Sequence, residues 1–225
     1  MTELGALVWP EVAARAPATV LALPVGSTEQ HGPHLPLCTD TEVAVALARR
    51  LTMLRRDVVI APPVAYGSSG EHAGFPGTLS IGQEALELLL VELIRSADAF
   101  AGTVIVSTHG GNAGLVHRAV DRLTAEGRPV RVWSPPAVDP TDTHAGHTET
   151  SLLLAIRPGA VRSEQAEPGV RQPLHQLWPA LVRGGVAAVS PNGVLGDPTD
   201  ASAEAGQRLL GEWTEDLFAA IAGWP

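Results

Sequence analysis

Cysteine and positive charge are both scarce in this sequence. Of its 225 residues only Cys38 is a cysteine, and 15 Lys and Arg are outnumbered by 24 Asp and Glu, which gives a net charge of −9. A single cysteine excludes a disulfide within the chain and a thiolate zinc site, so any metal must be held by nitrogen and oxygen. The acidic balance argues against a nucleic-acid partner, because phosphate binding needs clustered Lys and Arg.

Long apolar runs are also missing. The first residues, MTELGALVWP, do not combine a basic segment with an apolar one, and no run reaches the roughly 20 residues of a membrane span. We therefore expect a cytoplasmic protein without a membrane partner. Hydrophobic residues still make up 45% of the chain. Because no linker or repeat divides residues 1–225, we expect a single domain with one core.

Short apolar runs alternate with helical patterns along the chain. The runs predict buried strands at 18–25, 57–62, 103–107 and 130–133. The helical patterns lie at about 40–55, 83–101, 113–126, 149–156 and 201–222, with capping boxes expected at Thr39 to Glu42 and at Ser80 to Gln83. The stretch 157–198 is rich in Pro and Gly and gives no assignable pattern. This alternation predicts a three-layer α/β/α fold with a mainly parallel central sheet.

Histidines and carboxylates gather where strands end. Six of the eight histidines lie in segments that follow strands or precede helices: His31, His34, His72, His109, His144 and His147. Glu29 and Asp40 flank the first two. Open parallel sheets bind ligands beyond the carboxyl ends of their strands, and imidazole and carboxylate groups together suit zinc, iron or manganese.

Each of these residues also has a simpler interpretation. Asp40 fits a first-turn acid favoured by the helix dipole, and Glu149 fits a cap of the helix that follows it. Glu29 and His31 fit a hydrogen-bonded surface turn, and His109 fits a hydrogen bond to a neighbouring strand end. The spacing alone does not decide between these roles and metal binding.

Other catalytic signatures are weak or absent. Cys38 has no local signature of a cysteine hydrolase, and Ser27 and Ser107 lack a G-x-S-x-G elbow. The turn Gly110, Gly111 and Asn112 offers backbone N–H groups at a helix start, where a substrate or an oxyanion can approach. A phosphate-binding loop is excluded, because the turn has no lysine and no G-x-G-x-x-G pattern.

Five motifs, taken in order, resemble the creatininase (creatinine amidohydrolase) family. They are VGSTEQHGPHLPLCTD at 25–40, EHAGFPGT at 71–78, THGGN at 108–112, HAGHTETS at 144–151 and GDPTDAS at 196–202. These motifs reach across nearly the whole chain. The resemblance implies a three-layer α/β/α fold, a centre of two divalent ions (zinc, iron or manganese) and a closed homo-oligomer, a hexamer or an octamer.

The resemblance also implies roles for individual residues. Glu29 and His109 would bind one metal, His31 the other, and Asp40 would bridge them. The family's next carboxylate falls at Gly111 in this chain, so Glu149 is the candidate that completes the second site. His144 would act as the acid/base catalyst, while Glu71, His72, Gly110, Gly111 and Asn112 would line the cleft and bind substrate.

Within the family, the short chain and the HAGHTETS motif look most like the creatininase-like peptidase of mycofactocin biosynthesis. That resemblance implies release of a C-terminal Val-Tyr dipeptide from a modified precursor peptide. Thr143 and Gly111 replace two acidic positions of creatininase, which argues against creatinine, and Gly111 is also expected to leave room for a larger ligand. The alternatives are a creatininase or formamide hydrolase acting on a small amide, and a non-catalytic metal-binding assembly partner.

Overall fold

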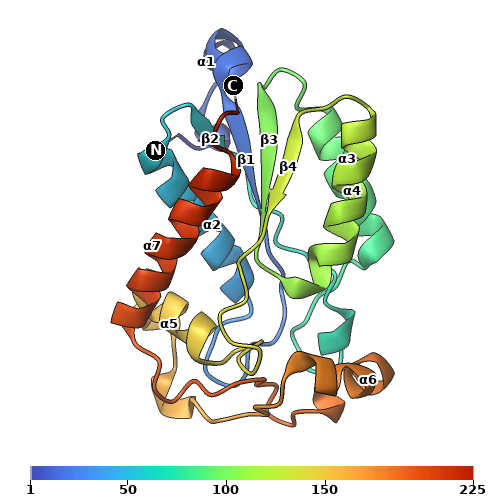
Figure 1. Ribbon diagram of the computed structural model, residues 1–225, viewed down its shortest axis with the longest axis vertical. Helices are drawn as coiled ribbons and strands as arrows, with labels where there is room; N and C mark the ends of the chain where they lie inside the picture. Colours follow the sequence, from blue (N-terminus) through green and yellow to red (C-terminus); the bar gives the residue numbers. More distant parts are fainter. Residues whose placement is uncertain (1, 225) are drawn as a thin grey trace.

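The computed structural model describes residues 2–224 and has a four-stranded parallel sheet at its centre (Figure 1). The strands are β1 (Val20–Val25), β2 (Val58–Ile60), β3 (Gly102–Ser107) and β4 (Val130–Trp133), in the order β2-β1-β3-β4. The register pairs Val20 of β1 with Val58 of β2 and with Gly102 of β3. All four strands were predicted from the sequence, each within two residues of the observed bounds.

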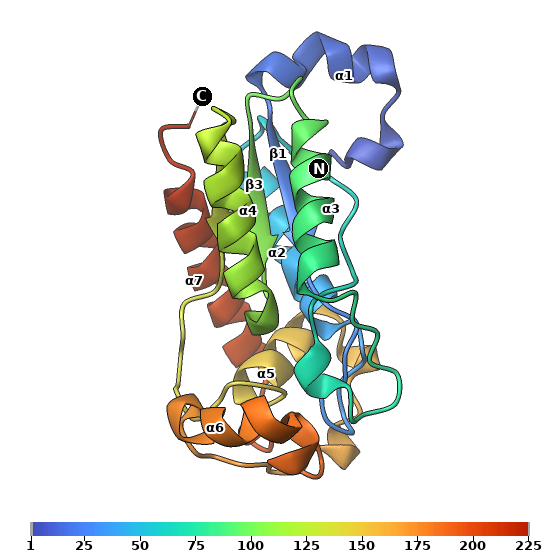
Figure 2. The ribbon, with the colours of Figure 1, turned by 90° about the vertical axis from the view of Figure 1, so that its right-hand side faces the viewer.

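Helices cover both faces of the sheet (Figures 1 and 2). On one face lie α2 (Thr39–Leu54), α5 (His147–Ile156) and α7 (Ala203–Ala220), and on the other lie α3 (Gln83–Arg95) and α4 (Ala113–Ala125). Side chains alternate along β1: Val20 and Ala22 pack into the first layer, and Leu21, Leu23 and Val25 into the second. Burial on both faces explains why the strands read as unbroken apolar runs, and the three-layer α/β/α prediction is confirmed.

Two helices lie outside these layers, and neither was assigned from the sequence. Helix α1 (Trp9–Arg15) projects beyond the end where the strands begin, and α6 (Leu174–Gly184) lies at the opposite end (Figures 1 and 2). Short 3-10 helices complete the chain: η1 (Leu4–Ala6), η2 (Ala16–Ala18), η3 (Gly70–His72), η4 (Gly110–Asn112), η5 (Pro158–Ala160), η6 (Ser163–Gln165) and η7 (Val186–Ala188). Within residues 2–224, none of the helices is long and apolar enough to cross a membrane.

Both predicted capping boxes are wrong. Helix α2 begins one residue early, at Thr39, and its N-cap, Cys38, makes no side-chain capping bond. The N-cap of α3 is Gly82, which has no side chain to cap with. The Ser80 hydroxyl instead accepts the backbone N–H of Ser69. At the start of α2, the hydroxyls of Thr39 and Thr41 donate to the backbone carbonyls of Pro36 and Ser27.

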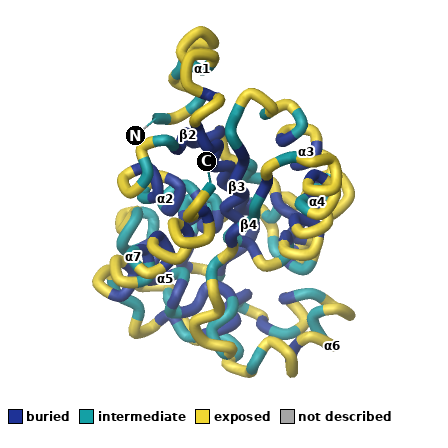
Figure 3. Tube along the Cα trace, turned by 45° about the horizontal axis from the view of Figure 1, so that its top comes forward, coloured by how far each residue is buried: buried dark blue, intermediate teal, exposed yellow. Residues whose placement is uncertain are grey.

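The buried part of the chain lies at the centre of the molecule, and both ends carry exposed helices. Figure 3 shows the strands as a buried centre, whereas α1 and most of α6 are exposed. The carboxyl ends of the strands lead into the loops that carry the predicted site residues. The candidate site therefore lies between the sheet and α6, at the end that sequence reasoning predicted.

Candidate metal centre

Glu29 lies at the middle of the site, in the loop between β1 and α2. Its side chain is fully buried, and neither carboxylate oxygen has a hydrogen-bond partner among the described residues. Its Oε1 atom lies 3.3 Å from His72 Nε2, 3.3 Å from His109 Nδ1 and 3.8 Å from His144 Nδ1. An unpaired buried carboxylate is costly, so this group calls for a bound cation or for protonated imidazoles.

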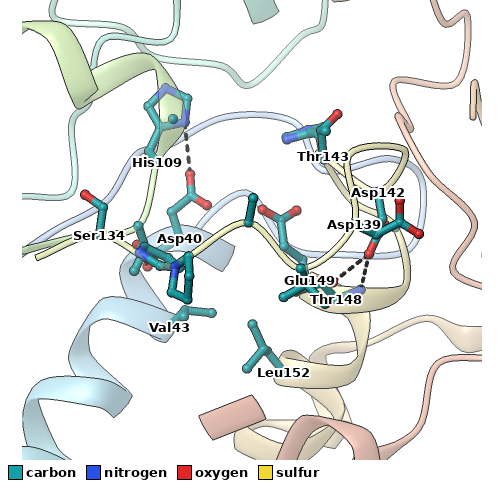
Figure 4. Close-up of a pocket in the computed structure, with 18 of the residues that line it drawn as sticks. Asp40, Val43, His109, Ser134, Asp139, Asp142, Thr143, Thr148, Glu149 and Leu152 are labelled. Atoms are coloured by element: carbon teal, nitrogen blue, oxygen red, sulfur yellow. Dashed lines mark hydrogen bonds and ion pairs between the residues drawn. The ribbon is translucent and has the colours of Figure 1, made fainter. Parts of the chain in front are cut away.

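Asp40, in the first turn of α2, contacts two histidines at once. Its Oδ1 atom lies 3.3 Å from His31 Nε2, and its Oδ2 atom lies 3.5 Å from His109 Nδ1. The Ser27 hydroxyl donates a hydrogen bond to Oδ2, which fixes the carboxylate in this orientation. Figure 4 shows Asp40 reaching from α2 toward His109, which follows β3. Each oxygen of the carboxylate thus faces a different histidine.

Glu149 contacts both the loop before α5 and the histidine cluster. It lies in the first turn of α5, where its Oε2 atom accepts the backbone N–H of Ala145 at 2.6 Å and lies 3.7 Å from His31 Nε2. Ala145 has a φ of 53°, a left-handed conformation that costs a residue with a Cβ roughly 1–2 kcal/mol. Such strain is typical of functional sites, and here it lies between His144 and the helix that carries Glu149.

Three of the histidines are held from behind by backbone carbonyls. His31 Nδ1 lies 3.1 Å from the Glu29 carbonyl, His109 Nε2 lies 3.1 Å from the Ser68 carbonyl, and His144 Nε2 lies 2.8 Å from the Gln30 carbonyl. A carbonyl only accepts, so each neutral ring carries its hydrogen on that outer nitrogen. The inner nitrogen then presents a lone pair to a carboxylate. Metal-binding histidines are oriented in this way.

The donor set therefore fits divalent metal ions. Ligand atoms lie within 4.8 Å of one another in three overlapping groups of the described residues, which are Glu29, His31 and Asp40; His31, His144 and Glu149; and Glu29, His72 and His144. All the donors are nitrogen or oxygen, as the single cysteine requires. Zinc, iron and manganese accept such donors.

The pKa values show how strongly the site favours positive charge. Burial would lower the pKa of His31, but the carboxylates of Asp40 and Glu149 raise this pKa to about 10. Burial would also lower the pKa of His109, but the carboxylates of Glu29 and Asp40 raise it to about 9. Burial would raise the pKa of Glu29, but His109 and its neighbours hold it well below the usual range. The carboxylates of this site are poorly solvated, and their negative charge can be neutralised by protons on the histidines or by metal ions.

The two remaining histidines of the predicted set are not at the centre. His34 is buried, but its Nε2 atom pairs with the Thr150 hydroxyl at 2.9 Å. His147 is the first residue of α5 and is partly exposed. Sequence reasoning also missed Gln30, a buried residue whose side chain contacts His72 and His144. Its only signal was its place between Glu29 and His31.

The space beside Gly111 is already filled. A Cβ atom there would lie 2.5 Å from Glu71 Oε1, 2.5 Å from His109 Nε2 and 2.6 Å from the Ser68 carbonyl. The expectation that this glycine makes room for a larger ligand is therefore wrong. Asn112 is also engaged, because its amide donates to the Gly26 carbonyl at 3.0 Å and accepts the Ser68 N–H at 2.9 Å.

A cavity of about 510 Å³ opens beside the centre. Its polar wall is formed by Asp40, His109, His144 and Glu149. Its apolar wall is formed by Val43, Pro135, Pro136, Ala137, Val138, Leu152, Leu174 and Trp213. Figure 4 shows Asp40, His109 and Glu149 facing this space from three different elements. Asp139, Asp142, Thr143 and Thr148 also line the cavity.

Known proteins match both the sequence and the fold. The chain is 48% identical over 232 residues to a mycofactocin precursor peptide peptidase of Mycobacterium tuberculosis, which covers 99% of this chain and 91% of the relative. It is 27% identical to the creatinine amidohydrolase of Pseudomonas putida, over 97% of this chain and 95% of the relative. A crystal structure of creatinine amidohydrolase superimposes with a TM-score of 0.85 at 27% identity, covering 100% of this chain and 98% of the other.

Two further creatininase structures bear on the metal. One is a mutant described as the Zn-Zn type, with a TM-score of 0.79, and the other is described as creatininase Mn, with a TM-score of 0.81; each is 25% identical to this chain and covers at least 98% of both chains. The creatininase family, described as creatinine amidohydrolase, matches residues 5–221. The chain belongs to the creatininase family of metal-dependent amide hydrolases.

Proposed function

We propose that this protein is a metal-dependent peptidase that releases a C-terminal Val-Tyr dipeptide from a modified precursor peptide in mycofactocin biosynthesis. The observation that carries the proposal is the buried cluster around Glu29, with its unpaired carboxylate, opening on a cavity with a broad apolar wall. The 48% identity to a peptidase of that name supports the substrate, against 27% for a creatinine amidohydrolase.

Two divalent ions, zinc, iron or manganese, would be held by five residues. Glu29 and His109 would bind the first ion, and His31 and Glu149 the second. Asp40 would bridge, because its two oxygens face His31 and His109 separately. When bound, the ions would polarise the scissile carbonyl and lower the pKa of a coordinated water. The backbone carbonyls behind the imidazoles would hold each ring in its ligand orientation.

His144 is the proposed acid/base catalyst. Its ring lies between those of His31 and His72, with centroids 4.4 Å from each. The Gln30 carbonyl binds Nε2, which leaves Nδ1 free on the side of the cluster. Nδ1 would take a proton from the attacking water and deliver it to the leaving amine, a contribution of about 10²–10⁴ in rate.

The substrate would lie in the 510 Å³ cavity, with its scissile bond against the polar wall. Proline, valine and tryptophan side chains on the opposite wall suit the valine and tyrosine side chains of the leaving dipeptide, since burying apolar groups favours binding. Gly110 lines the cavity next to His109. Glu71, His72, Gly111 and Asn112 do not line this cavity, so they would act on the substrate only through their contacts with His109 and with the loop after β1.

The test compares three substrates on one batch of metal-loaded enzyme. The kcat/KM is measured for a precursor peptide ending in Val-Tyr, for creatinine and for a formamide. We expect release of the dipeptide and poor hydrolysis of the other two. A clear preference for creatinine or the formamide would assign a small-amide hydrolase instead. Tight metal binding without turnover of any amide would assign a metal-binding assembly partner.

We also propose that the chain, as one hydrolase domain of residues 1–225, assembles into a closed hexamer or octamer in the cytoplasm. Large apolar side chains support this: Trp9 on α1 is 80% exposed, and Trp178 on α6 is 59% exposed. Exposed apolar groups of this size are typical of association surfaces. Light scattering coupled to size-exclusion chromatography measures the mass, and a monomer of 23.4 kDa would refute the assembly.

A further inference from the structure

The orientation of the Gln30 side chain is fixed by two backbone groups. Its Oε1 atom accepts the Gly32 N–H at 2.8 Å, and its Nε2 atom donates to the Gly193 carbonyl at 3.0 Å. An N–H can only donate and a carbonyl can only accept, so the oxygen and nitrogen of this amide cannot be exchanged. One N–H of the amide is used by Gly193, and one remains.

Two histidines lie within reach of that remaining hydrogen. Gln30 Nε2 lies 2.9 Å from His72 Nδ1 and 3.0 Å from His144 Nε2. His144 Nε2 carries its own hydrogen, which it donates to the Gln30 backbone carbonyl at 2.8 Å. Two donors cannot bond to each other. The amide hydrogen therefore goes to His72, whose Nδ1 atom must be the acceptor.

His72 consequently turns the opposite kind of ring nitrogen toward the centre. With Nδ1 accepting, the neutral ring carries its hydrogen on Nε2, and this atom lies 3.3 Å from Glu29 Oε1. His31, His109 and His144 bond outward through N–H and present lone pairs inward. His72 bonds outward through a lone pair and presents an N–H inward.

We infer that Gln30 locks His72 in the tautomer whose N–H faces Glu29, so that His72 offers no lone pair there and does not bind metal. The inference rests on the proposed function of Glu29 as a ligand. By distance alone, His72 belongs to a group of possible metal ligands with Glu29 and His144. The inferred tautomer excludes His72 from that group. Gln30 and His72 are then positioning residues: neither touches the metal, and each limits the freedom of a group that does.

Gly193 supports the arrangement from the far side. It has a φ of 80°, and a Cβ atom built there would collide with the Gln30 side-chain oxygen. Glycine is the residue that combines this conformation with so close an approach. The Gln30 amide thus fits into the space that a side chain at position 193 would fill. From there it reaches its backbone partners at Gly32 and Gly193.

The first test separates a donor from a ligand by substitution. His72→Gln keeps an N–H donor near the place of Nε2 but removes the imidazole lone pair, whereas His72→Ala removes both. We expect His72→Gln to keep the wild-type metal content. We expect His72→Ala to bind metal about 10–100-fold more weakly, as is usual when a partner of a ligand is lost. Loss of one ion per chain from a folded His72→Gln variant would make His72 a ligand.

The second test observes the hydrogen itself. Neutron diffraction from the deuterium-exchanged, zinc-loaded protein should show deuterium on Nε2 of His72 and none on Nδ1. In Gln30→Glu the carboxylate can only accept, and the deuterium should move to Nδ1. Deuterium on Nδ1 in the wild type would overturn the inference, and this measurement stands without the variant if Gln30→Glu does not fold. If the protein hydrolysed no amide, the proposed function would be refuted, but the position of the deuterium on His72 could still be determined.

Discussion

Asp40→Ala is the substitution that tests the centre most directly. The two oxygens of Asp40 face two different imidazoles, His31 at 3.3 Å and His109 at 3.5 Å. Structural zinc sites with four ligands bind with about 10–16 kcal/mol, which is roughly 2.5–4 kcal/mol for each ligand. Loss of a shared ligand would therefore weaken each of the two ions by about 10²–10³-fold. Both ions, and not one, should be affected.

The assay is metal content by elemental analysis after dialysis, with metal affinity measured by competition against a chelator. Asp139→Asn is the matched control, because Asp139 lines the same cavity but is exposed and accepts from Thr141. The control should keep its metal and its activity. If Asp40→Ala retained wild-type metal content, the bridging role would be wrong. Loss of a single ion would assign Asp40 to one site only.

Three further outcomes are expected. His144→Ala should keep its metal and lose about 10²–10⁴ in kcat; metal loss measured by elemental analysis would instead make His144 a ligand and displace Glu149. Gly193→Ala should push the Gln30 amide out of place and lower kcat, with little change in the far-ultraviolet circular dichroism; unchanged kinetics would contradict the contact. Chelation should lower Tm by about 16–32 °C for two ions, each present at about 1,000 times its Kd, measured by calorimetry with the metal restored as control; an unchanged Tm would argue against metal binding to the folded state.

The layers of the fold could be predicted because their signals are local. Val20 to Val25 are buried on both faces of the sheet, so the strand appears as an unbroken apolar run. Helix α1 gave no such signal, because Trp9 and its neighbours pack against little and are exposed. Helix α6 contains Pro179 and begins in a stretch rich in Pro and Gly. The sequence of α6 therefore resembles that of a loop, and its helical conformation depends on tertiary contacts.

The site was predictable in its residue types but not in its hydrogen bonds. Glu29, His31, Asp40 and His109 follow strand ends, and parallel topology brings such ends together. The tautomer of His72 depends on Gln30 and on a carbonyl at Gly193, more than 100 residues away in the sequence. No pattern in the sequence records which nitrogen of a ring accepts. That information exists only in the folded contacts.

Gly111 shows how a sequence difference can mislead about chemistry. The glycine suggested a lost carboxylate and an open space, but Glu71 brings its own carboxylate to that place, with Oε1 3.5 Å from His109 Nε2. Burial raises the pKa of Glu71, as expected for a carboxylate near Glu29 and Asp40. A carboxyl group is therefore retained beside His109, supplied by a different loop. Discrimination between a peptide and a small amide must then come from the shape and apolar wall of the cavity and not from the charge at position 111.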